Sequence, residues 1–381
     1  MNQFSFVGEI RPIKDSANFK GYEETSFNSG WQIKKLRFNM VCGDNRHLVE
    51  VSAGGWKDAN KNVIYTFSAG KDGEKGEKMQ VKWADRQNPD VIDKVANFRK
   101  YVVDLNTPGA LKAAQEAGDE AAIEAAKKRR KEFISEVDMV DYLNKLVNSD
   151  KIKGIKFRVV GNIEYSYSVN KNQFYRSFAI QKVYRAADDA ESASLGTIDT
   201  YFGKDCIDDA AFDDTKKYYV SAHTQFFENN NFKKNIFAPI QLVIDANGDD
   251  KAAKIAEGLK KKFDKIEGDE VRKICVAVKF LDGAQRRDIS YDDLTDDQKE
   301  SIDFGLVTLQ DIAREMSDGV YGDHITATQI IGLARGYSGG SVDTVYTVDD
   351  LALPTLNVEE DKSTATTDDL DDEFDIFGED F

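Results

Sequence analysis

The order in which β-rich and helix-rich segments follow one another constrains the fold more than any other feature of this sequence. Three β-rich segments come first, then a long helix-rich segment at residues 89–150, then two more β-rich segments. In the β-rich segments apolar and polar residues alternate with a period of two, which is typical of strands with one buried face. These segments are residues 4–10, 31–42, 47–53, 156–167 and 173–185.

This is the element order of the OB-fold, a five-stranded Greek-key barrel whose helix lies between its third and fourth strands. The sequence therefore predicts an α+β, mainly β chain. Its first domain, residues 1–185, is expected to be an OB-fold-like barrel that carries a helical insertion at 89–150. The insertion is longer than the fold needs, and other α+β domains share this order, so a different α+β domain stays open.

Residues 186–353 predict a second α+β domain with C-terminal helices within 292–335. One helix is expected at 250–266, and the expected strands are residues 195–202, 218–227, 236–245 and 271–281. Residues 172–183 and 231–243 share the spacing of Phe, Gln and Val, but the match needs gaps. A second OB-like barrel and an unrelated domain both stay open.

The charge is segregated toward the C-terminus. The chain carries a net charge of −16, and residues 349–381 hold 13 acidic residues against one Lys, so 12 of these negative charges lie there. From residue 354 onward little can be buried, and such a segment cannot offset its conformational entropy by packing. We expect residues 354–381 to form a disordered acidic tail.

Several classes of protein are disfavoured. No run of 18 apolar residues is present, and the N-terminus lacks the pattern of a secretory signal, so we expect no membrane association. Cys42, Cys206 and Cys275 are few and widely separated, which indicates reduced thiols and a cytoplasmic location. No phosphate-binding loop, Cys pair or His pair at metal-ligand spacing occurs. We therefore expect no enzyme, cofactor or metal, although an enzyme with a metal site in the acidic segment 205–214 stays open.

Basic and aromatic residues are interleaved on the predicted strands. Single-stranded nucleic acid is bound without sequence preference by cations that contact phosphates and by aromatic faces on which bases stack. On the strand at 31–42, Lys35 and Arg37 are expected to point outward. The candidate DNA-binding residues are Trp31, Lys34, Lys35, Arg37, Trp56, Lys156, Arg158, Tyr165, Tyr167, Lys171, Tyr175 and Arg176. The alternative is that the aromatic residues belong to the core and the charges to an ordinary surface.

Residues 127–131 are the densest basic run, and they fall on a predicted helix. They are either a second phosphate contact or a solvated helix surface.

The C-terminal segment embeds four apolar residues, Phe374, Ile376, Phe377 and Phe381, in a dense run of acidic residues. A segment that only increases solubility does not need phenylalanines. A docking peptide does, because an apolar anchor in a pocket supplies affinity while the carboxylates meet a basic rim. The sequence therefore predicts a partner-docking tail.

An OB-like body followed by an acidic tail that ends in Phe resembles the replicative single-stranded DNA-binding proteins of bacteria and bacteriophages. The resemblance implies that the tail recruits replication and repair proteins and competes with DNA for a basic groove on the body. Phe381 would then be the terminal anchor. The tip reads Glu-Asp-Phe, whereas the bacterial tip reads Ile-Pro-Phe, and together with the chain length this favours a large phage member.

The sequence thus predicts a single-stranded DNA-binding protein of phage replication or recombination, located in the host cytoplasm if it is phage-encoded. The alternative is a virion or assembly protein that docks through its acidic tail and does not bind DNA. The preference for DNA or RNA and the oligomeric state stay open.

Overall fold

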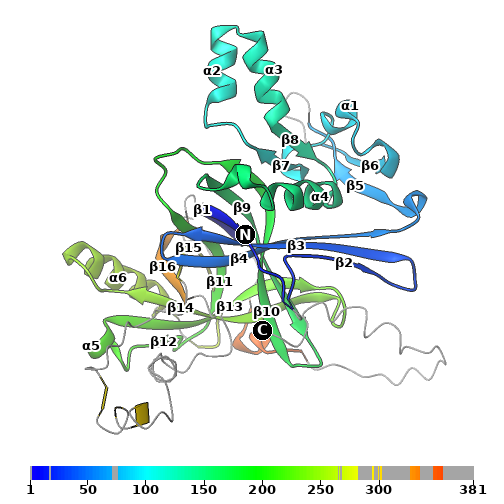
Figure 1. Ribbon diagram of the computed structural model, residues 1–381. Coiled ribbons are helices and arrows are strands. Elements are labelled where there is room, and N and C mark those ends of the chain that lie inside the picture. The colour runs from blue at the N-terminus through cyan, green and yellow to red at the C-terminus, as the bar shows by residue number, and fades with distance from the viewer. Residues whose placement is uncertain are drawn as a thin grey trace, which may run out of the picture.

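The chain is seen here as a computed structural model. It describes residues 2–16, 19–70, 76–264, 266, 268–281, 294–295, 299, 301–302, 327–334 and 346–354. The expected tail beyond residue 354 and most of the helices expected within 292–335 lie outside these residues. The described chain is mainly β, with a large continuous sheet and a helical arm that projects from it (Figure 1).

Five strands of the N-terminal half close into a barrel. Around the ring β1 pairs with β3, β3 with β4, β4 with β10, β10 with β9, and β9 with β1; only the β4–β10 pair is parallel. The strands are β1 (Gln3–Pro12), β3 (Trp31–Cys42), β4 (Asn45–Trp56), β9 (Lys156–Ser168) and β10 (Gln173–Arg185). Helix α4 (Glu136–Val147) lies between the third and fourth strands of this ring and buries Met139, Val140 and Leu143 against it. This is the predicted OB-fold order.

A second ring follows the same order. Here β11 pairs with β13, β13 with β14, β14 with β16, β16 with β15, and β15 with β11, again with only the third-to-fifth pair, β14–β16, parallel. The strands are β11 (Ala193–Phe202), β13 (Lys217–Glu228), β14 (Lys234–Asp245), β15 (Arg272–Leu281) and β16 (Ala327–Leu333), with α6 (Asp250–Phe263) between β14 and β15. The strand pairing therefore favours the second barrel that the sequence left open.

One prediction in this half is wrong. Within the region expected to hold C-terminal helices, residues 327–333 form β16. Thr328 and Ile330 of this strand are buried inside the barrel, so the segment follows a period of two and completes the ring between β14 and β15.

The two barrels are joined through their first strands. Gln3–Val7 of β1 pairs antiparallel with Ala193–Thr197 of β11, and beyond Gly8 the same edge of β1 turns to β3. A Cβ atom at Gly8 would lie 2.1 Å from the carbonyl oxygen of Val41, so only glycine allows this close passage. The buried side chains of both barrels form one continuous core, in which the Phe6 ring lies 4.9 Å from Phe178 and 5.8 Å from Phe280.

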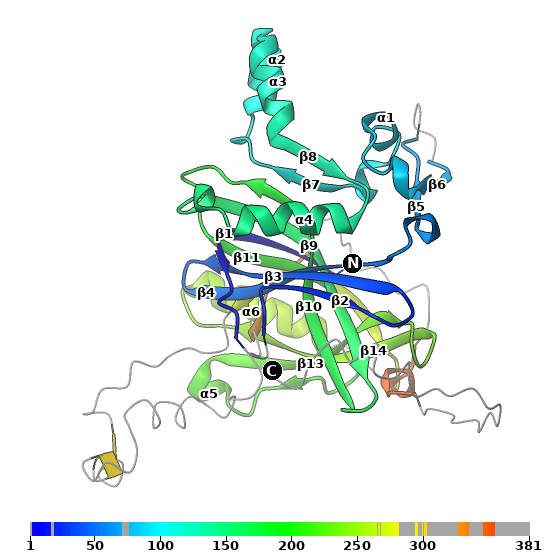
Figure 2. The same cartoon turned by 45° about the vertical axis from the view of Figure 1, so that its right-hand side comes forward.

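The insertion predicted as helical is only partly so. It holds α1 (Pro89–Ile92), α2 (Ala110–Ala117), α3 (Glu120–Arg129) and α4, but also two strands, β7 (Tyr101–Asp104) and β8 (Arg130–Phe133). β7 pairs with β10, and β8 pairs with β7, so the two strands extend the sheet of the barrel. Burial of Val102 and Val103 stabilises this extension. The α2–α3 hairpin stands on this extension and points away from both barrels (Figures 1 and 2).

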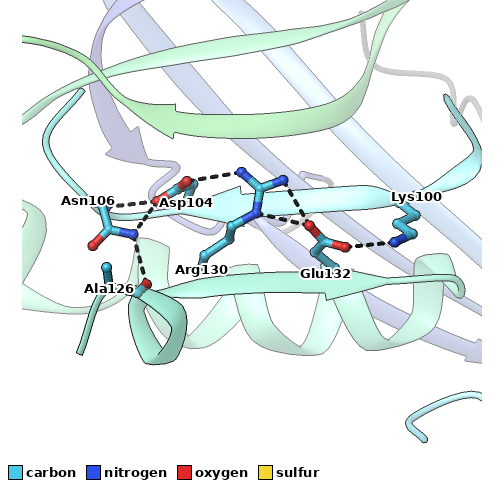
Figure 3. A network of polar contacts seen from close by, with 6 residues as sticks. All are labelled: Lys100, Asp104, Asn106, Ala126, Arg130 and Glu132. Atoms are coloured by element: carbon cyan, nitrogen blue, oxygen red, sulfur yellow. Dashed lines mark hydrogen bonds and ion pairs between the residues drawn. The ribbon is translucent and has the colours of Figure 1, made fainter. Parts of the chain in front are cut away.

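A polar network fixes the base of the arm (Figure 3). The Arg130 guanidinium donates to Asp104 at 3.2 Å and to Glu132 at 2.8 Å, and the Nζ of Lys100 donates to the other oxygen of Glu132 at 3.0 Å. The basic run at 127–131 is therefore divided between α3 and β8, contrary to the expected single helix, and Arg130 is engaged within the protein.

The remaining elements surround this frame. β2 (Tyr22–Ser26) pairs with β3, and β5 (Val63–Phe67) pairs with β6 (Lys78–Lys82) in a separate two-stranded sheet. The short elements are β12 (Ile207–Asp208), α5 (Phe212–Thr215) and the 3₁₀ helices η1 (Ala59–Lys61), η2 (Trp83–Asp85), η3 (Asn97–Arg99), η4 (Asp150–Ile152) and η6 (Val348–Leu351). No helix in the described part of the chain has the length and apolar character needed to cross a membrane.

Candidate nucleic-acid interface

Two tryptophans face each other at the outer end of β3 and β4, the second and third strands of the first barrel. Trp31 and Trp56 are register partners, and their rings meet edge to face with centroids 5.2 Å apart. Trp56 is 37% exposed, and the Nζ of Lys61 lies 5.4 Å from its ring centroid. A Cβ atom at Gly54 would lie 2.4 Å from the Trp31 ring, so this glycine makes room for the pair. The predicted Trp31 and Trp56 are thus brought together beside a cation.

Lys34, Lys35 and Arg37, on the same strand, do not face solvent as a group. The Nζ of Lys34 donates to Asp141 of α4 at 2.8 Å. Lys35 is 4% and Arg37 is 6% exposed. Lys35 and Arg37 lie on the face of β3 opposite Leu36 and Phe38, but they are covered there and do not reach solvent. The expectation that they are accessible to a nucleic acid is therefore wrong.

Carboxylates from two neighbouring strands explain this burial. The Arg37 guanidinium lies 2.9 Å from Glu23 of β2 and 3.7 Å from Glu50 of β4, and the Nζ of Lys35 lies 3.9 Å from Glu50. The guanidinium also lies over the ring of Phe19, at 5.0 Å. Burial lowers the pKa of Lys35, against the opposing effect of Glu50. β2 and the segment before it therefore place partners around a face that sequence alternation alone leaves exposed.

The aromatic residues of the β9–β10 hairpin pack against the second barrel. Tyr165 lies 6.3 Å from Phe226, and Tyr167 lies 5.9 Å from Phe232 and 4.8 Å from Phe174, between ring centroids. These ring contacts indicate that Tyr165 and Tyr167 have a structural role. The Tyr167 hydroxyl donates to Asn172 at 2.5 Å and that of Tyr175 to Gln173 at 3.3 Å, and Lys171 is exposed at the turn.

The remaining predicted cations are placed differently from one another. Arg176 donates to Thr328 of β16 at 3.2 Å, and its guanidinium lies over Phe178 and Phe280, so it bridges the two barrels. Burial lowers its pKa. The Nζ of Lys156 donates to the carbonyl oxygen of Ala190 at 2.6 Å. Arg158 is exposed on β9 and donates to the Ser5 hydroxyl at 3.2 Å.

A buried histidine next to Arg176 belongs to the core rather than to a site. The Nε2 of His47 lies 2.7 Å from the Ser194 hydroxyl, and its ring stacks on Phe6 at 4.5 Å. Burial, and to a lesser degree the charge of Arg176, lowers the pKa of His47 to about 4. His47 is therefore neutral at pH 7 and joins the two barrels by packing.

Sequence reasoning missed several accessible residues. Lys61 lies beside Trp56, and Tyr65 and Phe98 are 71% and 67% exposed. The available signal was the alternation of Val, Tyr and Phe over residues 63–67, which is the pattern of a strand.

The acidic segment 205–214 gathers no metal site. Asp209 pairs with Lys260 at 2.8 Å, and among the described residues no three His, Cys, Asp or Glu side chains are close enough to hold an ion. The predicted docking residues Phe374, Ile376, Phe377 and Phe381 lie outside the described residues.

Comparisons with known proteins add little to this geometry. No family model and no curated protein matches the sequence. Among solved structures, the chain is similar to the wild-type single-stranded DNA binding protein from Thermus aquaticus, with 10% identity, a TM-score of 0.29 and coverage of 74% of this chain and 85% of that one. A deletion mutant of the same protein gives 8% identity, a TM-score of 0.27 and coverage of 74% and 87%. Superpositions at these TM-scores do not define a shared fold, whereas the strand pairing defines the two barrels.

Proposed function

We propose that this protein binds single-stranded DNA in phage replication or recombination, without enzymatic activity, and recruits partner proteins through its acidic tail. The observation that carries the proposal is the exposed Trp56, with Lys61 over its ring and Trp31 at its edge, on the second and third strands of a five-stranded barrel. In an OB-fold these strands and the adjoining loops bind oligonucleotides. The ring offers a stacking face and the lysine a phosphate contact.

The proposal assigns DNA binding to fewer residues than the sequence predicts. Trp31, Trp56, Arg158 and Lys171 keep their proposed role. Lys34, Lys35, Arg37, Lys156 and Arg176 act in this proposal as structural residues because they are engaged with carboxylates, carbonyl oxygens or the second barrel. Tyr165 and Tyr167 act in this proposal as packing residues against Phe226 and Phe232. Tyr175 is left out of the binding set because its hydroxyl bonds Gln173 on its own strand.

The first test is a fluorescence titration with a labelled oligo-dT strand, an oligo-rU strand and the matching duplex at two salt concentrations. Binding to the single strand should quench tryptophan fluorescence and weaken steeply as salt rises, because phosphate contacts release counterions. Trp56→Ala should weaken binding by ~5- to 150-fold, the equivalent of one base stack, and Trp56→Phe should retain most of it. If neither the full chain nor a chain lacking the tail binds a single strand, the proposal is wrong. The alternative, a virion or assembly protein that does not bind DNA, would then be favoured.

The second test concerns the tail. Residues 359–381 carry a net charge of −10. If the tail competes with DNA for the basic surface of the body, its deletion should tighten binding most at low salt, where charge interactions are least screened. Equal affinity with and without these residues at every salt concentration would contradict the competition.

A further inference from the structure

The two-stranded sheet of β5 and β6 has one buried and one open face. Ile64, Thr66, Met79 and Val81 face inward over a small core that includes Val95 and Ile134. The opposite face carries Val63, Tyr65 and Phe67 on β5 and, directly across, Lys82, Gln80 and Lys78 on β6. Aromatic and basic side chains thus lie next to each other on one narrow surface, called here the ribbon face.

The segment that follows α1 extends the ribbon face. The N–H of Ala96 donates to the carbonyl oxygen of Phe67 at 2.9 Å, and the N–H of Ala69 donates to that of Lys94 at 2.7 Å. This pairing places the ring of Phe98 6.1 Å from that of Phe67, and the Arg99 guanidinium lies 5.0 Å and 5.6 Å from the two ring centroids. We include Phe98 and Arg99 in the ribbon face.

Two of the three rings on the ribbon face, those of Tyr65 and Phe98, are exposed, and the ring of Phe67 is partly buried. Tyr65 is 71% exposed and Phe98 is 67% exposed. Single exposed apolar residues are common and need no explanation, but several aromatic rings gathered on one surface indicate a binding surface. The rings of Tyr65 and Phe98 therefore leave room for a planar partner to stack.

The charge of the ribbon face has one sign. None of its residues is acidic, and Lys78, Lys82 and Arg99 form no ion pair within the described part of the chain. Lys35 and Arg37 differ from these three residues because carboxylates surround their charged groups. Three exposed cations beside open rings match a ligand that is both anionic and aromatic.

The ribbon face is held firmly beside the tryptophan pair. β4 ends at Trp56, η1 follows and packs against η2, and β5 begins at Val63, so Figures 1 and 2 draw the ribbon just beyond the outer end of β4. The Arg86 guanidinium lies 4.3 Å from the Trp83 ring and 2.9 Å from Asp138 of α4, which ties the ribbon to the barrel. A strand that is bound at Trp56 can therefore extend onto the ribbon face, whose position relative to the barrel is fixed.

We propose that the ribbon face is a second contact for single-stranded nucleic acid, outside both barrels, which continues the path that starts at Trp31 and Trp56. Bases stack on Tyr65, Phe67 and Phe98, and phosphates are contacted by Lys78, Lys82 and Arg99. Stacking needs only the π-face of a base, so the contact is tolerant of sequence. The inference rests on the proposed function, and it deepens it by assigning a longer binding path.

The experiment measures affinity for oligo-dT strands of increasing length with the full chain. The double variant Tyr65→Ala/Phe98→Ala should bind long strands ~5- to 150-fold more weakly for each stack lost, while short strands that reach only the tryptophan pair are bound as by the wild type. Arg99→Ala should lower the slope of log K against log salt by about 0.7 for one lost phosphate contact. Lys254→Ala/Ile255→Ala on α6, where both residues are also exposed, is the matched control and should change neither quantity.

Photocrosslinking supplies an independent readout that needs no variant. A strand carrying 5-iodouracil should form adducts with Tyr65 or Phe98 in the wild-type protein, mapped by mass spectrometry. If the wild type binds no strand, the proposed function fails. If Trp56→Ala weakens binding but the ribbon variants bind all strand lengths like the wild type, only the ribbon inference is overturned. Ribbon variants that bind strands normally but lose binding of a synthetic peptide of residues 359–381 would make this face a protein-docking surface instead.

Discussion

Single residues in this protein show how charge type alone fails to identify a binding site. Lys35 and Lys61 are both lysines on or near the hairpin of β3 and β4, yet one is buried beside Glu50 and the other lies over an exposed ring. Removing one partner of a buried ion pair leaves an uncompensated charge, which costs far more than removing an exposed one. Whether a cation is structural or available to a ligand therefore depends on its burial and on its charged partners.

Arg37→Ala is the residue-scale prediction. Since Arg37 is held by Glu23 and Glu50, its loss should lower the free energy of unfolding by about 3 kcal/mol, measured by urea denaturation. The affinity of the folded variant for single strands should not change. Lys112→Ala, which removes an exposed pair with Glu116, is the control and should have no measurable effect on stability. If the Arg37→Ala variant is as stable as the wild type but binds DNA weakly, Arg37 is a DNA-binding residue and the prediction is wrong.

At the scale of elements, the course of β1 depends on one point where its backbone lies very close to that of β3. β1 serves both barrels because its edge changes neighbour from β11 to β3 at Gly8. The backbone of β3 lies so near that a methyl group would overlap the carbonyl of Val41. Overpacking against backbone cannot be relieved by a rotamer change.

Gly8→Ala should therefore lower the free energy of unfolding by about 3 kcal/mol or more, seen as a lower midpoint in thermal or urea unfolding. Gly258→Ala in the middle of α6 is the matched control, since no atom lies within 4 Å of the added Cβ. That variant should be more stable than the wild type by about 0.5–1 kcal/mol because alanine favours helix. Equal effects of the two substitutions would show that the strand crossing at Gly8 tolerates a side chain.

At the scale of the whole molecule, the two barrels behave as one packed body. β1 and β11 share a ladder, Arg176 bonds across to Thr328, and Phe6 and Phe280 belong to the same continuous core. A domain interface made of shared sheet and buried aromatic rings couples the unfolding of its two sides.

We expect a single cooperative unfolding transition. All three tryptophans lie within residues 31–83, so tryptophan fluorescence reports on the first barrel and its ribbon, whereas far-ultraviolet circular dichroism reports on both barrels. The two signals should give the same midpoint in urea. Two separated midpoints would mean that the barrels unfold independently and that the shared ladder is weak.

The sequence predicted the strands more accurately than the helices, for a physical reason. Period-two alternation located β1, β3, β4, β9 and β10, because each strand buries one face against a core. The helical composition of the insertion did not exclude β7 and β8. β7 forms because β10 offers it an edge to pair with, and β8 forms because β7 then offers the next edge. Pairing partners far away in sequence leave no local signal.

The amino-acid sequence by itself determined the period of each strand, the order of elements in the first barrel and the segregation of negative charge into its last residues. The tertiary structure decided which faces are covered. Alternation assigned Lys35 and Arg37 to the outer face of β3, but only the fold of β2 and the position of Glu50 buried them. Tyr65 and Phe98 stay exposed because no element within the described residues packs over them. A local pattern sets the direction of a side chain, whereas its neighbours come from contacts between residues distant in sequence.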